Sequence, residues 1–578
     1  MAFGSIKDLV TSVAQASPPQ FDDWRKSWRA ATTGGSTEPL LSFIARECGL
    51  AEDVFMQRLA KSLDWPFIEL GKVSVPMEAR NKISTKIAFQ YSVLPSALNE
   101  DNSLQVVTSD PFDAAMVNAV RFDARTPVRF ALAPKVEIEK ALKKYYGVGA
   151  ETLDEMGESE SMELDIASDK EITADDQEAS VIKFVNQIIW EAYKDRATDI
   201  HFEPAEDELR IRYRIDGILH QTPMPPQLKR FQAALISRIK VMSGMNIAEK
   251  RLPQDGRINV RIKGEEIDIR VSTVPTVYGE SVSLRLLTRG KIFLSLDKLG
   301  FAGKDEAMIR EIIIKPHGIF LVTGPTGSGK STSLYAFLSA INSVHRRIIT
   351  IEEPVEYELK GINQIAVRPE IGLTFAMGLR HILRQDPNVV MVGEIRDSET
   401  ADIAIRASLT GHLVFSTLHT NDASSAFTRL IDMGIEPFLV ASSVEAIMAQ
   451  RLVRTICKHC KTEQKVERDY LRKIGFPAEE IDTAKFWRGA GCEECRQFGY
   501  QGRKGIYELL IVNESLRPLI LNRSAASTIA MRAMENGMRT LRTDGWNKVK
   551  NGETTIEEVL RVTQIEDHME ALGGGEKS

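Results

Sequence analysis

The stretch Gly324-Pro325-Thr326-Gly327-Ser328-Gly329-Lys330-Ser331 decides the fold of this chain. It follows the apolar run 319–323, which predicts a buried strand, and it precedes a helix-compatible run over 331–341. Glycines here let backbone N–H groups surround phosphate oxygens, and the positive end of the helix dipole adds to the attraction. Lys330 can reach the β- and γ-phosphates, and the hydroxyl of Ser331 can ligate Mg²⁺. Together with Thr332, the stretch predicts a site for a nucleoside triphosphate.

Further segments with strand patterns carry polar residues at their ends. The run 348–352 ends in Glu352, with Glu353 next to it, and the run 389–393 precedes Glu394. In open α/β sheets ligands bind beyond the carboxyl ends of the strands, where a carboxylate can hold Mg²⁺ or orient the attacking water. The run 413–417 has a histidine on each side, His412 and His419, and either could polarise the γ-phosphate.

The order of strand and helix patterns predicts several domains. Residues 1–150 mix helical spacing, as over 39–59, with a strand-like run at 104–108, and we expect an N-terminal docking or regulatory domain. Residues 151–180 carry twelve Asp or Glu against one Lys, which predicts an acidic flexible linker. Residues 181–292 predict a small α+β domain: a helix, a basic strand at 209–215, a turn and hairpin strands. Residues 293–456 predict an α/β core whose sheet is buried on both faces, and residues 496–578 a helical C-terminal part.

Composition restricts the function. The net charge is −6, which argues against a dedicated nucleic-acid-binding protein. No apolar run approaches the roughly 18 residues of a membrane span, and the N-terminus lacks the apolar core of a signal peptide. We therefore expect a cytoplasmic protein, or one that is peripheral on the cytoplasmic face of a membrane.

Four of the five cysteines form two C-x-x-C pairs, Cys457 with Cys460 and Cys492 with Cys495. Four thiolates in two chelating pairs suit structural Zn²⁺, and four protein ligands leave no open position for catalysis. Free thiols and disulfides are the alternatives. Because the intervening segment is short of large apolar residues, we expect the metal to hold residues 457–495 together.

The chain resembles the secretion and pilus-assembly ATPases, which are the motor ATPases of type II secretion systems and the extension ATPases of type IV pili. The resemblance rests on the phosphate loop and on a series of motifs in one order: Ala197-Thr-Asp-Ile-His-Phe-Glu-Pro204, Ile211-Arg-Tyr-Arg-Ile-Asp-Gly217, Ile247-Ala-Glu-Lys-Arg-Leu-Pro-Gln-Asp-Gly-Arg257, Leu383-Arg-Gln-Asp-Pro387, Gly393-Glu-Ile-Arg-Asp397 and Ser416-Thr-Leu-His-Thr-Asn-Asp422. It implies a RecA-like P-loop ATPase core, and the four cysteines place the chain with the assembly branch.

The resemblance also implies roles for individual residues. Glu352 would position water, Glu394 would act with Mg²⁺, and His412 and His419 would form a histidine box. Arg212 and Arg214 would contribute charge to the phosphates from the small domain. The family usually has Glu-Asp-Pro where this chain has Glu352-Glu353-Pro354, which leaves open which carboxylate is the base.

The partners that the resemblance implies are an inner-membrane platform protein and a membrane-anchored docking protein, with the ATPase as a homohexamer at the inner membrane. Two other functions compete with this interpretation. One is a nucleic-acid translocase with the same core, which the acidic net charge disfavours. The other is an ATPase regulated by a cyclic dinucleotide, which is disfavoured because residues 37–41 read Thr-Glu-Pro-Leu-Leu where such domains open with Arg-Leu-Gly.

Overall fold

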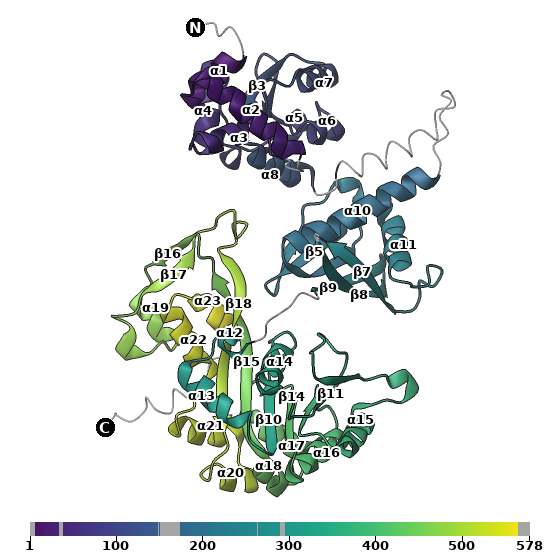
Figure 1. Ribbon diagram of the computed structural model, residues 1–578, viewed down its shortest axis with the longest axis vertical. Coiled ribbons are helices and arrows are strands. Elements are labelled where there is room, and N and C mark those ends of the chain that lie inside the picture. The colour runs from purple at the N-terminus through teal and green to yellow at the C-terminus, as the bar shows by residue number, and fades with distance from the viewer. Residues whose placement is uncertain are drawn as a thin grey trace. The chain divides into compact units, whose positions relative to one another are not determined.

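The structure, a computed structural model, describes residues 6–33, 38–147, 150, 174–262, 264–288 and 295–563. Figure 1 shows its helices and strands in chain order. The chain divides into two compact units, Met1–Thr288 and Arg289–Ser578, and each is described by itself.

The first part of the N-terminal unit is helical and then becomes α/β. Its elements are α1 (Ile6–Ala14), α2 (Pro18–Thr33), α3 (Leu40–Glu47), α4 (Glu52–Leu63), α5 (Met77–Arg80), α6 (Thr85–Gln90), β1 (Leu94–Leu98), β2 (Leu104–Thr108), α7 (Ala114–Ala124), β3 (Val128–Leu132) and α8 (Lys135–Tyr146). The three strands form a sheet in the order β1-β2-β3, so the strand expected at 104–108 is confirmed. The helical spacing over 39–59 corresponds to two helices, because the chain turns at Gly49 with φ 70°.

The second part of this unit is a helix-covered antiparallel sheet. Its elements are α10 (Ala174–Lys194), β4 (Ala197–Pro204), β5 (Leu209–Ile215), β6 (Ile218–Gln221), α11 (Gln232–Met242), β7 (Gln254–Ile262), β8 (Glu265–Thr276) and β9 (Gly279–Thr288). The strand order is β6-β5-β4-β9-β8-β7. The predicted basic strand is confirmed as β5, whose Leu209, Ile211 and Tyr213 are buried. The helix begins at Ala174, so the end of the expected linker is helical, and 151–173 lie outside the described residues.

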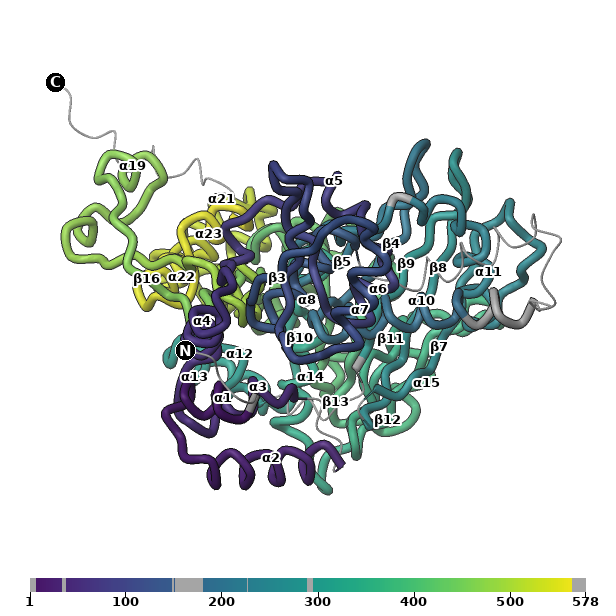
Figure 2. Tube along the Cα trace, turned by 90° about the horizontal axis from the view of Figure 1, so that it is seen from above, coloured from purple at the N-terminus to yellow at the C-terminus, as the bar shows by residue number. Residues whose placement is uncertain are grey.

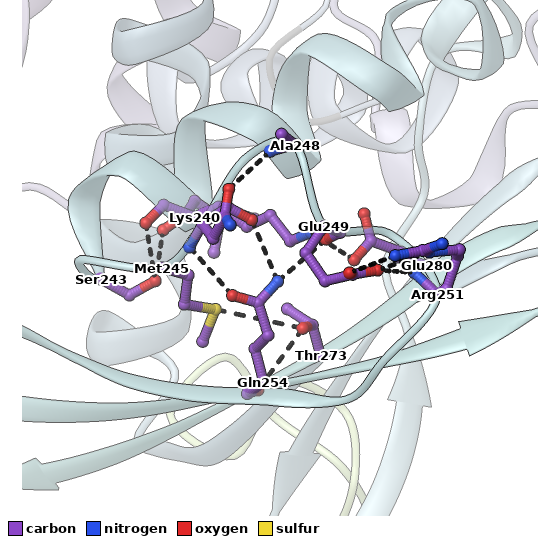
Figure 3. Close-up of polar contacts among 11 residues, drawn as sticks. Lys240, Ser243, Met245, Ala248, Glu249, Arg251, Gln254, Thr273 and Glu280 are labelled. Carbon is purple, nitrogen blue, oxygen red and sulfur yellow. Dashed lines mark hydrogen bonds and ion pairs between the residues drawn. The ribbon is translucent and has the colours of Figure 1, made fainter.

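A buried lysine fixes the loop between α11 and β7 (Figure 3). The Nζ of Lys240, whose side chain is 1% exposed, lies 2.5 Å from the carboxylate of Glu280 and donates to the carbonyl of Glu249 at 2.6 Å. The side-chain amide of Gln254 accepts from the N–H of Asn246 and donates to the carbonyls of Asn246 and Glu249. A buried charge is costly unless it is paired, so Lys240 keeps its contacts with Glu280 and Glu249. Together with the hydrogen bonds of Gln254, these contacts fix the loop that carries the motif at 247–257.

The second unit is built on one sheet. Its strands are β10 (Gly318–Thr323), β11 (Ile348–Glu352), β12 (Asn363–Ala366), β13 (Val389–Val392), β14 (Leu413–Leu418), β15 (Val444–Ile456) and β18 (Tyr500–Ile511), in the order β12-β11-β13-β14-β10-β15-β18. All neighbouring strands are parallel except β15 and β18. The expected strands at 319–323, 348–352, 389–393 and 413–417 are confirmed to within a residue at their ends.

Helices cover both faces of this sheet, as the α/β expectation requires. They are α12 (Leu296–Leu299), α13 (Gly303–Ile312), α14 (Lys330–Ile341), α15 (Phe375–Ile382), α16 (Ser398–Leu409), α17 (Ser425–Asp432), α18 (Pro437–Ser443), α20 (Arg517–Leu521), α21 (Ala526–Glu535), α22 (Leu541–Lys550) and α23 (Ile556–Val562). Along β10, Ile319 and Leu321 join one apolar cluster, whereas Phe320 and Val322 join the cluster on the opposite face. Successive side chains of a strand point to opposite faces, so the sheet is buried on both sides.

The C-terminal residues differ from the expectation. Residues 496–578 were expected to be helical, but they begin with β18, which pairs antiparallel with β15 as the edge strand. The segment between these two long strands carries β16 (Lys461–Gln464), α19 (Arg468–Lys473) and β17 (Phe486–Gly489). In both views it lies beside α22 and α23 (Figures 1 and 2).

Candidate nucleotide site and metal centre

The phosphate loop lies where the sequence predicts it, between β10 and α14. Gly324, Gly327 and Gly329 have φ values of 148°, 78° and 90°. A Cβ on Gly324 would lie 2.6 Å from the carbonyl oxygen of Gln450, and one on Gly329 would lie 2.8 Å from Nε2 of the same residue. Both the backbone conformation and the close approach therefore require glycine. Helix α14 begins at Lys330, so its N-terminal N–H groups face the loop.

Lys330 is held over the loop by backbone carbonyls. Its Nζ donates to the carbonyl oxygens of Gly324 at 2.8 Å and Pro325 at 3.0 Å. Burial lowers the pKa of Lys330 to about 8, with Arg451 contributing in the same direction and Glu394 opposing it. Desolvation disfavours the charged ammonium, and an anion that enters the loop stabilises it.

Glu394 lies at the carboxyl end of the sheet together with His419. The His419 Nε2 lies 3.3 Å from the Glu394 Oε2, and the Arg396 Nη2 lies 2.5 Å from the Glu394 Oε1. β13, β14 and β10 are neighbouring parallel strands, so Glu394 and His419 follow strands that end at the same end of the sheet as the strand that leads into the phosphate loop. Sequence reasoning did not assign Arg396, although it belongs to the quoted motif at 393–397.

The two adjacent glutamates at the end of β11 have different surroundings. Glu352 is 4% exposed, and its carboxylate accepts hydrogen bonds from the Tyr335 hydroxyl, from Thr350 at 2.5 Å and from Gln364 at 3.1 Å. Glu353 is exposed to solvent, and Arg396 donates to its carboxylate at 2.9 Å. Arg396 therefore bridges Glu353 and Glu394, whereas Glu352 is enclosed.

The structure does not bring His412 to the phosphate loop. It precedes β14 at the amino end, where its carbonyl accepts from the N–H of Gly318 at the start of β10. The phosphate loop follows the other end of β10, a whole strand away. The ring Nδ1 of His412 lies 3.0 Å from the carbonyl oxygen of Ala407.

Arg212 and Arg214 belong to the other unit, on β5. Arg212 Nη2 lies 2.5 Å from the Glu203 carboxylate, and Arg214 Nε lies 3.7 Å from Asp199. Asp199 also accepts from the Nε of Arg285 at 3.1 Å. Both predicted arginines therefore have a carboxylate partner within their own sheet.

The four predicted cysteines converge. The Sγ atoms of Cys457, Cys460, Cys492 and Cys495 all lie within 4.8 Å of one another, with separations of 3.7 Å for 457–492 and 460–495 and 3.6 Å for 492–495. A tetrahedral zinc with Zn–S bonds of about 2.3 Å places its sulfurs about 3.8 Å apart. The geometry and donor chemistry of the cluster therefore fit a metal site.

The few large apolar residues of the segment that carries the cysteines share an apolar cluster with α22 and α23, which the sequence did not predict. Phe476 and Phe486 stack edge to face at 5.4 Å, and Phe476 contacts Trp546 of α22 at 5.5 Å. Leu471 and Ile481 join the same cluster. The segment is therefore packed against α22 and α23, and the expectation that it has few large apolar residues of its own remains compatible with this packing.

The chain also matches known families and their members. The family model described as "Type II/IV secretion system protein" matches residues 174–561, and the model of the MshEN domain matches residues 63–152. The type II secretion system protein E of Xanthomonas campestris pv. campestris is 42% identical over 535 residues, which cover 91% of this chain and 93% of that protein. The type IV pilus assembly ATPase PilB of Myxococcus xanthus is 38% identical over 568 residues, which cover 96% and 97%.

A solved structure agrees in fold. The X-ray structure of the Yersinia pseudotuberculosis ATPase DotB matches with a TM-score of 0.50 and 19% identity, and it covers 70% of this chain and 98% of that one. At this identity the likeness concerns the fold alone.

Proposed function

Because the chain belongs to the type II/IV secretion system protein family, we propose that it is the motor ATPase that drives either type II protein secretion or pilus assembly. The chain is a P-loop ATPase. The observation that carries the proposal is that Lys330, Glu394 and His419 all follow the carboxyl ends of neighbouring parallel strands of one sheet, with His419 beside Glu394. The acidic net charge and the relatives' names favour such a motor over a nucleic-acid translocase.

The site residues would divide the work of phosphoryl transfer. Lys330 and the N–H groups of 324–332 would hold the phosphates of ATP, and Ser331 would ligate Mg²⁺, which supplies neutralising charge. Glu394 would orient the ligands of that ion, and His419 would donate to a phosphate oxygen.

For the attacking water, we favour Glu353 over Glu352. Glu353 is exposed and linked to Glu394 through Arg396, whereas Glu352 is buried with three donors on its carboxylate. A general base must lie within hydrogen-bond reach of the water. In this assignment Glu352 holds the end of β11 through Tyr335, and His412 is left out of the catalytic set.

The remaining assignments are proposals supported by the family. Arg212 and Arg214 would add charge to the developing phosphoryl group within a homohexamer, since a guanidinium fork suits phosphate oxygens. The cysteine cluster would hold Zn²⁺. Residues 6–147 would dock on membrane-anchored partners and 289–563 would act on a platform protein, which gives a peripheral location at the inner membrane. In the described part of the chain, no helix has the length and apolarity needed to cross a bilayer.

The proposal is tested by measuring ATP hydrolysis by the full chain. The measurement is made with and without the cytoplasmic domain of a platform protein, and with single- or double-stranded DNA. We expect stimulation by the platform domain and none by DNA. Stimulation by DNA alone would show that the chain is a nucleic-acid translocase and not a secretion motor.

A further inference from the structure

The loop that carries His419 is anchored to the core by residues outside the family's catalytic motifs. The first anchor is Thr323, the last residue of β10. Its hydroxyl donates to the carbonyl of Leu418 at 3.1 Å and accepts from the N–H of Thr420 at 2.9 Å. The segment that follows β14 is thereby joined to the residue that precedes the phosphate loop.

The second anchor is Arg451 on β15. Its Nη2 donates to the carbonyl of Asn421 at 2.9 Å, and its Nη1 donates to the carbonyl of Gln450 at 3.1 Å. The same Nη1 would lie 3.1 Å from a Cβ placed on Gly324, so the guanidinium borders the phosphate loop. One planar fork thus holds the backbone of the His419 loop against the backbone beside the phosphate loop.

The third anchor is a buried carboxylate on the edge strand. Glu508 of β18 is 4% exposed, and its Oε1 accepts from the N–H of Ala423 at 2.8 Å. Its Oε2 accepts from the N–H of Leu541, the first residue of α22, at 3.3 Å. Burial lowers the pKa of Arg451, and the carboxylates of Glu508 and Asp422 oppose that shift. Both anchors bond to the backbone of the same loop, at Asn421 and at Ala423.

We propose that Arg451 and Glu508 are positioning residues of ATP hydrolysis, which act as one unit to fix residues 419–423 and hence the ring of His419 beside Glu394. The inference rests on the proposed role of His419. The pair acts through the loop and not on the nucleotide. A displacement of His419 by about 1 Å is enough to cost roughly a hundredfold in rate, while the phosphate loop keeps its own contacts.

Glu508 also gives this loop a connection to the cysteine segment. Its second oxygen holds the start of α22, and Trp546 on the same helix contacts Phe476. The carboxylate thus bonds to the catalytic loop on one side and to the helix under the metal-bearing segment on the other. A partner that displaces the segment would act on the His419 loop by way of α22.

The test compares Arg451→Gln, Glu508→Gln, the double variant and Arg451→Lys in the full chain. We measure kcat and KM for ATP, the affinity for a fluorescent ATP analogue with Mg²⁺, and the melting temperature. We expect each glutamine variant to lose about ten- to a hundredfold in kcat with unchanged analogue affinity. The double variant should lose no more than the worse single one, because the two residues act as a unit. Arg451→Lys should recover part of kcat, since it keeps the charge but not the fork.

The proposal is overturned if the glutamine variants keep the kcat of the unmodified chain, or if the losses multiply in the double variant. A loss of analogue affinity in step with kcat also overturns it, because the pair would then bind nucleotide. If Glu508→Gln does not fold, Thr323→Val takes its place, since it removes the first anchor with little change in shape. It must then lower kcat without lowering affinity.

The matched control is Glu445→Gln. Glu445 lies on the same strand as Arg451 and forms an ion pair with Lys315 at 2.5 Å, at the amino end of β15 and away from the phosphate loop. It should keep the kcat of the unmodified chain. Failure of the proposed function is distinguishable from failure of this inference. If the proposed function is wrong, the unmodified chain itself lacks ATP hydrolysis that depends on Lys330.

Discussion

The hydroxyl of Tyr335 on α14 donates a hydrogen bond to the carboxylate of Glu352 at the end of β11. Burial and the charge of Glu352 both raise the pKa of Tyr335, so the phenol remains a donor. The helix that follows the phosphate loop and the strand that ends in the two glutamates are therefore joined beneath the site. Because this bond helps to enclose Glu352, we assign a structural role to Glu352 and the role of general base to Glu353.

The two neighbouring glutamates should respond differently to substitution. Glu353→Gln should lose about a hundredfold or more in turnover, because an amide cannot take a proton, while the melting temperature stays unchanged. Glu352→Gln, by contrast, should lower the melting temperature, because an amide cannot accept from all the donors that surround the carboxylate. The free energy of unfolding should fall by about 1–3 kcal/mol. Turnover and thermal unfolding are measured on both variants. Full turnover in Glu353→Gln, with none in a stably folded Glu352→Gln, would return the base to Glu352.

The second prediction concerns acid stability through Glu558. Burial raises the pKa of this carboxyl, but hydrogen bonds from Arg561 and Arg454 outweigh burial and hold it at about 2. A carboxyl whose pKa is lowered by folding stabilises the folded state above its unfolded pKa, near 4.5, and this stability is lost as the pH falls toward 2. Glu558→Gln should therefore lower the free energy of unfolding at pH 7 by about 1–3 kcal/mol.

The measurement is denaturant unfolding of both proteins from pH 7 to pH 3. The difference between them should narrow below about pH 4.5, where the native carboxylate loses its advantage. A difference that stays constant down to pH 3 would show that Glu558 acts through packing alone.

Much of the second unit was predictable from the sequence, because its central strands are short apolar runs bounded by the phosphate loop and by the carboxylates. The strands β15 and β18 were not predicted. They pair across the whole cysteine segment, and a pairing between residues so far apart leaves no local pattern. Glu352 and Glu353 are adjacent in the sequence, and nothing in the sequence indicates which of the two would be buried and bonded to Tyr335 of α14. His412 was grouped with His419 through the resemblance to the family, although the two histidines lie at opposite ends of β14.

The third prediction concerns the metal. We expect the purified chain to hold one zinc ion on Cys457, Cys460, Cys492 and Cys495, and elemental analysis measures it. Cys457→Ser with Cys492→Ser should remove the metal and expose the cysteine loops to limited proteolysis. The contacts of Phe476 and Phe486 with Trp546 should keep the rest of the segment docked, and analogue binding should survive. Metal-free protein with four freely titratable thiols would rule the site out.

A fourth prediction concerns the arginines of the small domain. Arg212→Gln and Arg214→Gln should reduce turnover by roughly ten- to a hundredfold and leave nucleotide affinity less affected, because charge develops on the phosphoryl group only in the transition state. Arg210→Gln is the matched control, since Arg210 lies on the same strand and forms an ion pair with Glu208. Equal turnover in all three variants would leave the small domain without a catalytic arginine on this strand.

We propose that residues 324–332 form the site at which this chain hydrolyses ATP, and the test compares turnover in the full chain with that of Lys330→Ala. The substitution removes an ammonium that contacts only the loop's own carbonyls among the described residues, so the fold should persist. We predict that hydrolysis falls to background while the circular dichroism spectrum and the melting temperature stay the same. Turnover equal to that of the unmodified chain, in a correctly folded Lys330→Ala protein, would contradict the account.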